Sequence, residues 1–544
     1  MSNETENDVT IISNNGNSAA NSEIQEYLSL RQQRRWVFPR AALVGAGAGA
    51  VALLFRAALT GADVLRNGLI GWAQNFPLFG WLFPVLFAAS GATIAVAMTR
   101  RYAPEASGSG IPHIEAVLMR FRQLDWKRVL PVKFFGGIIG IGTGLALGRE
   151  GPTVQMGGAI GDAISRLLKV TERERLVLIS AGGGAGLAAA FNAPLSGLIF
   201  VLEELRRDFQ PIVFGAAFIA AVIADIITRI GSSQFPVFSV PSYPVPPLTS
   251  LPIFAVLGIV AGFLGVLFNK TLLIAAKLYG RLPEKYVLPA AAITGSAIGL
   301  IGWFAPSLTG SGNSLAESAL KGDLILSIIP VFFVLRFLMT TTSYGAGAPG
   351  GIFTPLLILG AMIGLAIGQL ANSLVPSIVP IPAIFAVVGM AAYFTAIVRA
   401  PLTGIMLIVE MTGNYSQMLP LLVSCFCAYA VAEFLKDLPV YEALLERDLQ
   451  KGGSSYSIKE PVVVEFIVHE GSAFAGLPVR SLGLPAGCIL VRCSDGKHEW
   501  VPKASTRLDA HMHITAVISP DAENALKILR EGCSGPSGNA EFAD

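Results

Sequence analysis

Long uncharged runs of apolar residues are the dominant pattern in this 544-residue chain. Residues 176–202 carry no charged side chain, and neither do residues 337–398. A helix of about 20 apolar residues crosses a bilayer, so each run is long enough to span one. Runs of this kind are too long for the core helices of a soluble protein. The pattern predicts an all-α polytopic membrane protein over most of the chain.

Glycine and proline interrupt several of these apolar segments. Three breaks stand out: Gly108-Ser109-Gly110-Ile111-Pro112, Gly148-Arg149-Glu150-Gly151-Pro152 and Gly347-Ala348-Pro349-Gly350-Gly351. Non-helical backbone is tolerated at membrane depth only where protein buries it or where it lines an aqueous cavity. The breaks therefore predict helices that begin or end partway across the membrane, around a path.

The apolar part of the chain also contains an internal repeat. Gly108-Ser109-Gly110 recurs as Gly310-Ser311-Gly312, and the block from Ala193 to Gly197 recurs from Ala400 to Gly404. Two homologous halves are the usual build of secondary transporters, which bind substrate where the halves meet. The duplication alone leaves open whether the halves are inverted.

Changes in composition divide the chain into parts. Residues 1–35 are polar, with disorder expected over 1–22 and a short amphipathic helix over 23–35. Residues 36–445 form the membrane part, with repeat 1 at about 36–232 and repeat 2 at about 250–435. Residues 446–455 are interpreted as a linker, and residues 456–544 as a small soluble α+β domain.

Basic residues before the first apolar run predict the orientation. They are Arg31, Arg34, Arg35 and Arg40. By the positive-inside rule this end stays in the cytoplasm. We expect both termini there, in a multi-pass protein of the cell membrane.

Composition excludes several classes of function. Charged residues make up 14% of the chain, against about 25% in soluble proteins. A net charge of +2 without a basic tail gives no reason to expect a nucleic-acid partner. Five cysteines do not form a disulfide framework, and the histidines His498, His511 and His513 lack a metal-ligand spacing. No nucleophile–base pair indicates an enzyme, so we expect no catalysis, metal or cofactor.

The residues after each break suit the start of a helix. Pro152 follows Gly151 at a position suited to the first helical turn, and Ile352 and Phe353 follow Gly350-Gly351. A helix start leaves backbone N–H groups unpaired and carries the positive end of the helix dipole. Several starts at one point would bind an anion without a full positive charge. The alternative is that the glycines only let helices pack closely.

These motifs together resemble the signature set of the CLC family of chloride channels and chloride/proton antiporters. The match includes Gly-Ser-Gly-Ile-Pro at 108–112, Gly-Arg-Glu-Gly-Pro at 148–152, Gly-Gly-Ile-Phe-Thr-Pro at 350–355 and Leu438-Pro439-Val440-Tyr441. The resemblance implies two inverted halves, a homodimer and one anion pathway per subunit. It also implies that the Ser109 and Tyr441 hydroxyls and the N–H groups of Ile352 and Phe353 hold chloride.

Two acids carry the expected coupling to protons. Glu150 lies at a helix start inside the membrane, where an ionisable group is a functional candidate, and the resemblance makes it the gate and proton carrier.

Glu203 and Glu204 lie at the end of an apolar run. From this position alone they would be a pair of solvated acids. Glu203 is matched by Glu410 in the repeat, whereas Glu204 has no matching acid, and the resemblance makes Glu204 the internal proton-transfer residue. Aligning Gly148 with Gly347 pairs Glu150 with Pro349.

Two further features have open or negative interpretations. Lys133 stands in apolar surroundings, either tuning the pathway's potential or serving as a structural lysine. The glycines from Gly45 to Gly49 superficially resemble a dinucleotide fingerprint, but no strand precedes them and no acid follows at the required distance. We reject that interpretation.

The C-terminal residues form short alternating runs, such as Val462–Val468 and Ile489–Arg492, with a final helix expected near Ala522–Arg530. Glu470-Gly471-Ser472-Ala473-Phe474-Ala475-Gly476, followed by Leu482-Gly483-Leu484-Pro485, resembles the TrkA-C (RCK C-terminal) domain. The resemblance implies a regulatory role and a small ligand such as a nucleotide. Ala510-His511 departs from that family's Gly-Asp.

The sequence as a whole predicts a chloride/proton antiporter. A passive voltage- or pH-gated chloride channel of the same fold is the alternative. A membrane-embedded enzyme or sensor is the rival of another class, and no catalytic residue pattern favours it.

Overall fold

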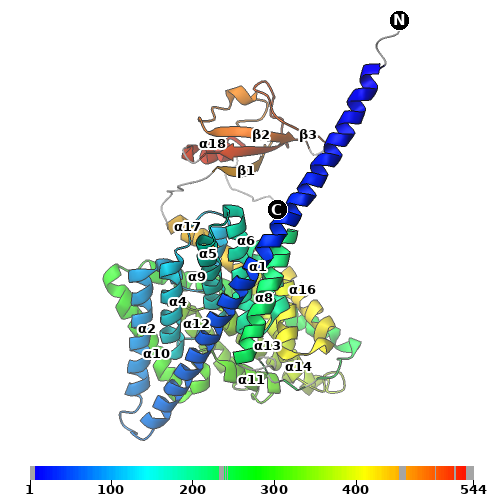
Figure 1. Ribbon diagram of the computed structural model, residues 1–544. Helices are drawn as coiled ribbons and strands as arrows, with labels where there is room; N and C mark the ends of the chain where they lie inside the picture. The colour runs from blue at the N-terminus through cyan, green and yellow to red at the C-terminus, as the bar shows by residue number, and fades with distance from the viewer. Residues whose placement is uncertain are drawn as a thin grey trace. The chain divides into compact units, whose positions relative to one another are not determined.

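The computed structural model describes residues 6–231, 238, 240, 241, 243–451, 461–495, 498–519 and 522–533. The chain divides into two compact units, Met1–Arg447 and Asp448–Asp544. The first unit is helical, and the second contains the strands (Figure 1).

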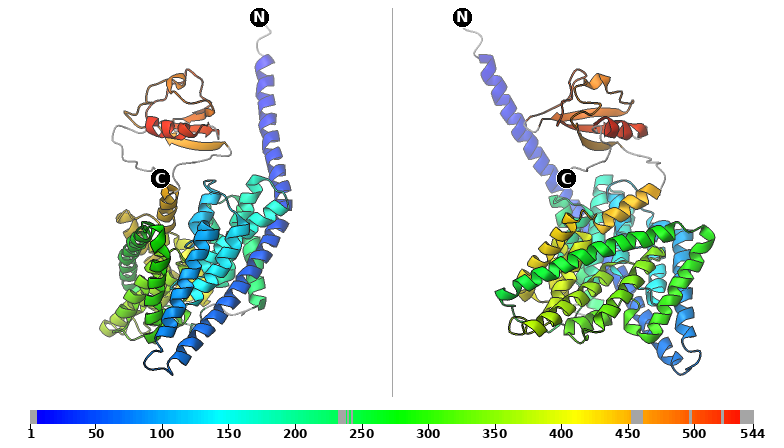
Figure 2. Two further views of the ribbon diagram at one scale, coloured as in Figure 1. Left: turned by 90° about the vertical axis from the view of Figure 1, so that its left-hand side faces the viewer. Right: turned by 180° about the vertical axis from the view of Figure 1, so that it is seen from behind.

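The helices of the first unit are numbered in chain order. They are α1 (Glu6–Ala73), α2 (Leu82–Tyr102), α3 (Ile111–Leu118), α4 (Trp126–Gly142), α5 (Glu150–Leu167), α6 (Glu172–Phe191), α7 (Pro194–Phe200), α8 (Pro211–Gly231), α9 (Leu251–Gly280), α10 (Glu284–Phe304), α11 (Asn313–Lys321), α12 (Ile329–Gly345), α13 (Phe353–Leu374), α14 (Ala383–Val398), α15 (Pro401–Thr412), α16 (Met418–Phe434) and α17 (Val440–Lys451). Figure 2 shows them from two further sides.

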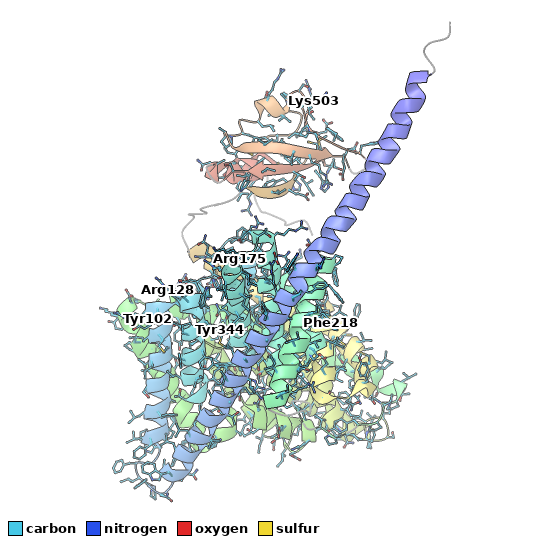
Figure 3. The ribbon with its side chains drawn as sticks, in the orientation of Figure 1. Tyr102, Arg128, Arg175, Phe218, Tyr344 and Lys503 are labelled. Carbon is cyan, nitrogen blue, oxygen red and sulfur yellow. The ribbon has the colours of Figure 1, made fainter. Side chains whose placement is uncertain are left out.

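Helices of membrane-spanning length confirm the polytopic prediction. Within the described residues, seven helical segments are long and apolar enough to cross a bilayer: Arg35–Ala73, Leu82–Tyr102, Pro211–Gly231, Leu248–Gly280, Glu284–Phe304, Phe353–Leu374 and Tyr415–Phe434. Their outer faces expose large apolar side chains, among them Phe218 of α8. Arg128 and Arg175 lie toward one end of the helical unit, whereas Phe218 lies nearer its middle (Figure 3).

The two ends of this unit differ from the sequence-based expectation. Helix α1 runs from Glu6 to Ala73, through residues for which disorder and a separate short helix were predicted. No proline precedes Pro39 in that stretch, so no residue there lacks the backbone N–H that helical hydrogen bonding requires. At the other end, α17 continues to Lys451, so the predicted linker begins inside a helix. Residues 452–460 lie outside the described part.

The halves of the membrane unit are related by inversion at its centre. Gly148 and Gly351 form an antiparallel bridge and exchange two N–H···O bonds, each 2.7 Å long. These glycines stand two residues before the first residues of α5 and α13. An equal exchange between equivalent residues requires a local two-fold axis, which runs between two inverted copies.

The same helix pairs pack closely in both halves. A Cβ atom on Gly157 of α5 would lie 2.1 Å from the Gly182 carbonyl of α6. The equivalent pair in the second half is Gly360 of α13 and Gly389 of α14, where that distance would be 2.4 Å. Small residues let these backbones touch, as is usual for helices in membranes. Gly45 and Gly49 likewise lie within α1 against Ala220 and Ala224 of α8, which agrees with the rejection of a dinucleotide site.

The second unit is a small α+β domain, as predicted. Its strands are β1 (Val462–Ile467), β2 (Cys488–Ser494), β3 (Glu499–Trp500) and β4 (His513–Ile518), in the antiparallel order β1-β4-β2-β3. Helix α18 (Glu523–Cys533) contacts β1 and β4. Its buried residues join those of β4 in one core, and burial raises the pKa of the Cys533 thiol to about 12, so that this thiol stays protonated and unreactive at neutral pH.

Candidate anion and proton site

The three glycine-containing breaks meet at one place in the membrane unit. Gly108 N donates to Ala348 O at 3.1 Å, and Gly350 N donates to Gly108 O at 3.0 Å. A Cβ on Gly151 would lie 2.4 Å from Ser109 Oγ and 3.0 Å from Gly351 Cα. Only glycine permits this approach. The three breaks seen in the sequence therefore lie together in the membrane unit.

Two helix starts face this junction. Helix α5 begins at Glu150, so Pro152 lies in its first turn, as the sequence suggested. Helix α13 begins at Phe353. No backbone carbonyl among the described residues accepts a hydrogen bond from Ile352 or Phe353. Free N–H groups at a helix start are suited to an anion.

The carboxylate of Glu150 already occupies part of this environment. It is buried and accepts hydrogen bonds from the Thr354 hydroxyl at 2.5 Å and from Thr354 N at 3.4 Å. Arg149 Nε lies 3.7 Å from the same carboxylate, while Arg149 Nη2 donates to Ala190 O. The carboxyl group of one helix start therefore lies at the start of the other helix. Thr354 was not among the site residues predicted from the sequence, although it lies inside the 350–355 motif.

Two hydroxyl groups stand beside these helix starts. Ser109 Oγ and the Tyr441 hydroxyl are fully buried, and neither has a hydrogen-bond partner among the described residues within 3.5 Å. The two groups lie close to one another, and the Tyr441 ring stacks on Phe353 with centroids 6.1 Å apart. A buried hydroxyl without a partner is costly, so a polar ligand between them would satisfy both.

Buried cations support the Gly-Ser-Gly loops in both halves. Lys133 of α4 donates to Ala106 O at 3.0 Å and to Gly108 O at 2.6 Å. Arg336 of α12 donates to Leu308 O at 2.6 Å and Ser311 O at 2.9 Å. Arg336 was not predicted from the sequence, although it follows Lys133 by nearly the same offset that separates the two Gly-Ser-Gly motifs. These contacts favour the structural interpretation of Lys133.

The matched acids of the repeat also have matched partners. Glu203 accepts from Leu402 N, Thr403 N and the Thr403 hydroxyl, at the start of α15. Glu410 accepts from Leu195 N, Ser196 N and the Ser196 hydroxyl, at the start of α7. Each acid caps the equivalent helix of the other half. An architectural role for Glu203 follows from this reciprocity, and the interpretation of Glu203 and Glu204 as a solvated pair is wrong.

The unmatched acid, Glu204, is buried in the turn of π-helix that follows α7, at Val201–Leu205. Its side chain lies within hydrogen-bonding reach of Glu115 of α3, which is also buried. Arg207 and Glu442, 3.6 Å apart, stand close to this pair. No role was predicted for Glu115 from the sequence. An acidic residue among the mostly apolar residues of a short helix is the sequence signal that could have identified Glu115.

The pairing of Glu150 with Pro349 in the repeat is wrong. The two helix starts and the Gly148–Gly351 bridge align Glu150 with Phe353. Glycine-rich loops admit several registers in sequence, and only the positions of the helix starts select one. Glu150 still has no acidic counterpart in the second half.

The chain shows clear similarity to known proteins along most of its length. Residues 91–433 match the family described as voltage gated chloride channel, and residues 463–529 match the TrkA-C domain. The H(+)/Cl(-) exchange transporter ClcA of Vibrio parahaemolyticus is 41% identical over 433 residues, which cover 78% of this chain and 93% of that protein. The protein of the same name from Citrobacter koseri is 38% identical, with 77% of this chain and 90% of that protein covered.

Solved structures show the same similarity. The crystal structure of a slow cyanobacterial Cl-/H+ antiporter matches with a TM-score of 0.74 and 38% identity, over 76% of this chain and 98% of that one. A CLC-type fluoride/proton antiporter shares the fold at 21% identity, with a TM-score of 0.64, over 75% of this chain and 97% of that one. The protein is therefore a member of the voltage gated chloride channel family, and it carries a TrkA-C domain after its membrane unit.

Proposed function

We propose that this protein exchanges chloride for protons across a membrane. The observation that carries the proposal is the position of Glu150, an ionisable anion held at the start of α13 beside the unpartnered hydroxyls of Ser109 and Tyr441. A carboxylate in that position competes with a mobile anion for the same donors. The named exchangers among the relatives support the same reaction.

Chloride would bind between the two hydroxyls and the free N–H groups of Ile352 and Phe353. These donors are neutral, so they attract an anion without the strong hold of a full positive charge. Protonation of Glu150 would remove its negative charge and weaken the hydrogen bonds that it accepts from Thr354. The side chain could then move aside and open the path. Each opening would then take up one proton at Glu150.

A passive channel of the same fold is the second candidate function. A channel needs no buried acid away from the anion path. Glu204 is buried next to Glu115, which favours a separate route for protons and thus exchange.

Further features of the protein are proposed along with this function. We infer a homodimer in the cell membrane with both termini in the cytoplasm, and transport without enzymatic catalysis. The TrkA-C domain would regulate transport through a small ligand such as a nucleotide.

Purified protein in liposomes tests exchange directly. Chloride efflux down its gradient should drive proton uptake against an opposing pH gradient, and the uptake should stop when chloride is omitted. Chloride efflux without proton uptake would establish the channel instead.

Replacement of Ser109 by proline should change anion selectivity. The substitution removes one hydroxyl donor, which favours the small, strongly hydrogen-bonded chloride ion over the more weakly hydrated nitrate. We expect nitrate flux to rise relative to chloride flux by about tenfold, a change of ~1.4 kcal/mol. Parallel flux assays with the two anions measure this ratio. An unchanged ratio would place Ser109 outside the anion site.

Removal of residues 448–544 should leave a transporting membrane unit. The two units are separately compact, and every residue proposed for the anion and proton paths precedes Asp448. Gel filtration and the liposome assay would measure assembly and exchange of the shortened protein. Loss of assembly would give the C-terminal domain a structural role.

A further inference from the structure

A pocket of about 320 Å³ lies at one end of the membrane unit, apart from the proposed anion path. It is lined by Gln123, Ser165, Arg166, Lys169, Val170, Glu172 and Arg175. These residues come from the loop between α3 and α4, the end of α5, the loop between α5 and α6, and the start of α6. We propose that this pocket binds a phosphate group, carried either by a soluble molecule or by a lipid headgroup.

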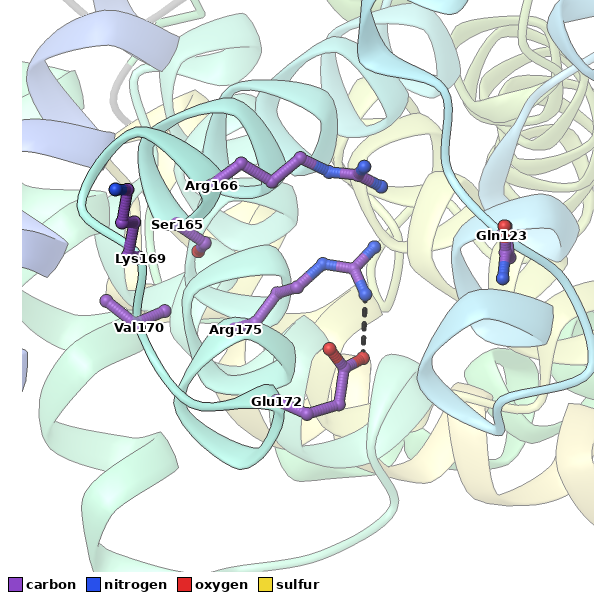
Figure 4. Close-up of a pocket in the computed structure, with 7 residues that line it drawn as sticks. All are labelled: Gln123, Ser165, Arg166, Lys169, Val170, Glu172 and Arg175. Carbon is purple, nitrogen blue, oxygen red and sulfur yellow. Dashed lines mark hydrogen bonds and ion pairs between the residues drawn. The ribbon is translucent and has the colours of Figure 1, made fainter. Parts of the chain in front are cut away.

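A buried carboxylate fixes the two arginines of the pocket. Asp162 accepts from Arg166 Nε at 2.8 Å and from Arg175 Nε at 2.6 Å, and its side chain is fully buried. Each bond uses the Nε atom of a guanidinium group, so Asp162 does not occupy the Nη atoms. Figure 4 shows both side chains extending next to one another toward Gln123 on the opposite wall.

The hydrogen bonds of Arg175 are incomplete. Its Nη1 donates to Glu172 at 2.7 Å, whereas its buried Nη2 has no partner among the described residues. A buried donor on a charged group without an acceptor is unfavourable and requires an explanation. An oxyanion in the pocket would provide the missing acceptor.

The charges of the lining residues and the geometry of their side chains favour a phosphate group. Three cations line the pocket, and Asp162 and Glu172 are the acids that contact them. Lys169 forms no ion pair that the structure records within the described residues. Arginine forks match the geometry of phosphate oxygens, and a lysine adds a point charge. The pocket is also much larger than a chloride ion requires.

Contacts connect the pocket to the helix that follows Ser109. Arg166 Nη2 donates to Leu124 O at 3.1 Å, in the loop after α3. His113 of α3 contacts Gln155 of α5, with His113 Nδ1 3.1 Å from Gln155 Nε2. A ligand held by Arg166 and Gln123 would therefore stabilise α3 against α5. The pocket lies on the side where α1 enters the unit, because Arg40 of α1 pairs with Glu174.

Titration of the full-length protein with pyrophosphate in detergent tests the soluble form of the ligand. Calorimetry at constant ionic strength should detect one site per chain. Arg166→Gln should weaken binding about tenfold, as expected for the loss of one charge-assisted contact. Lys169→Gln, which removes no recorded contact, should weaken it roughly threefold. Arg128→Gln is the matched control, since Arg128 is a 74% exposed arginine outside the pocket, and it should bind as the wild type does.

Nanodiscs of phosphatidylcholine with or without phosphatidic acid test the lipid form. If phosphatidic acid raises the unfolding temperature of the wild type and of Arg128→Gln but not of Arg166→Gln, the group belongs to a lipid. Binding in either experiment with this pattern supports the site. The proposal is overturned if neither probe acts, if sodium chloride of equal ionic strength reproduces the effect, or if the three variants respond alike. Neither measurement depends on transport, so failure of chloride/proton exchange would leave the result unaffected.

Discussion

Replacement of Glu150 by glutamine is expected to abolish proton movement while chloride movement continues. Glutamine keeps the size of the side chain and can still contact Thr354, but it carries no charge and takes up no proton. Chloride would no longer compete with a carboxylate at the start of α13. Chloride flux should then lose most of its dependence on external pH, because the carboxyl group whose protonation opens the path is absent.

Chloride and proton flux should be recorded together, in the same liposomes, for the wild type and for Glu150→Gln. The matched control is Glu317→Gln, which removes an acid from α11, the helix equivalent to α3. Glu317 is 43% exposed and pairs with Lys321 at 3.8 Å, away from the junction. The control should exchange as the wild type does. Retained coupling in Glu150→Gln would contradict the gating role and leave Glu150 as a partner of Arg149.

Replacement of Glu204 by glutamine is the second change with a large expected effect. Proton flux should fall to the level of empty liposomes, while chloride flux should stay within about twofold of wild type, since no hydrogen bond recorded among the described residues joins Glu204 to the proposed anion donors. The amide keeps a hydrogen-bonding group next to Glu115 but carries no transferable proton. Proton flux against a pH gradient measures the loss.

The neighbouring acid provides the control for this experiment. Glu203→Gln removes the charged cap of α15, so the free energy of unfolding should fall by about 1 kcal/mol while coupling is retained. Thermal unfolding in detergent measures the first effect, and the liposome assay the second. If Glu203→Gln loses coupling and Glu204→Gln keeps it, the two roles are reversed.

The sequence by itself determined the class of the protein, its duplication and most of the proposed site. Uncharged runs fix a membrane location because the bilayer core excludes charged side chains and unpaired backbone groups. Glycine-containing breaks marked the junction because only glycine allows the approach of Gly151 to Ser109. The breaks, the repeat and the unmatched Glu204 are local properties of the chain, and each could be recognised without coordinates.

The tertiary structure alone decided what each charged residue contacts. Glu203 and Glu204 are adjacent in sequence, yet one caps α15 and the other is buried beside Glu115. Their partners lie nearly two hundred residues away for Glu203 and about ninety for Glu204, and no local pattern specifies such contacts. The register of Glu150 against Phe353, the matching of Lys133 with Arg336 and the incomplete bonding of Arg175 have the same origin. A side chain's electrostatic role depends on distances set by the packing of remote helices.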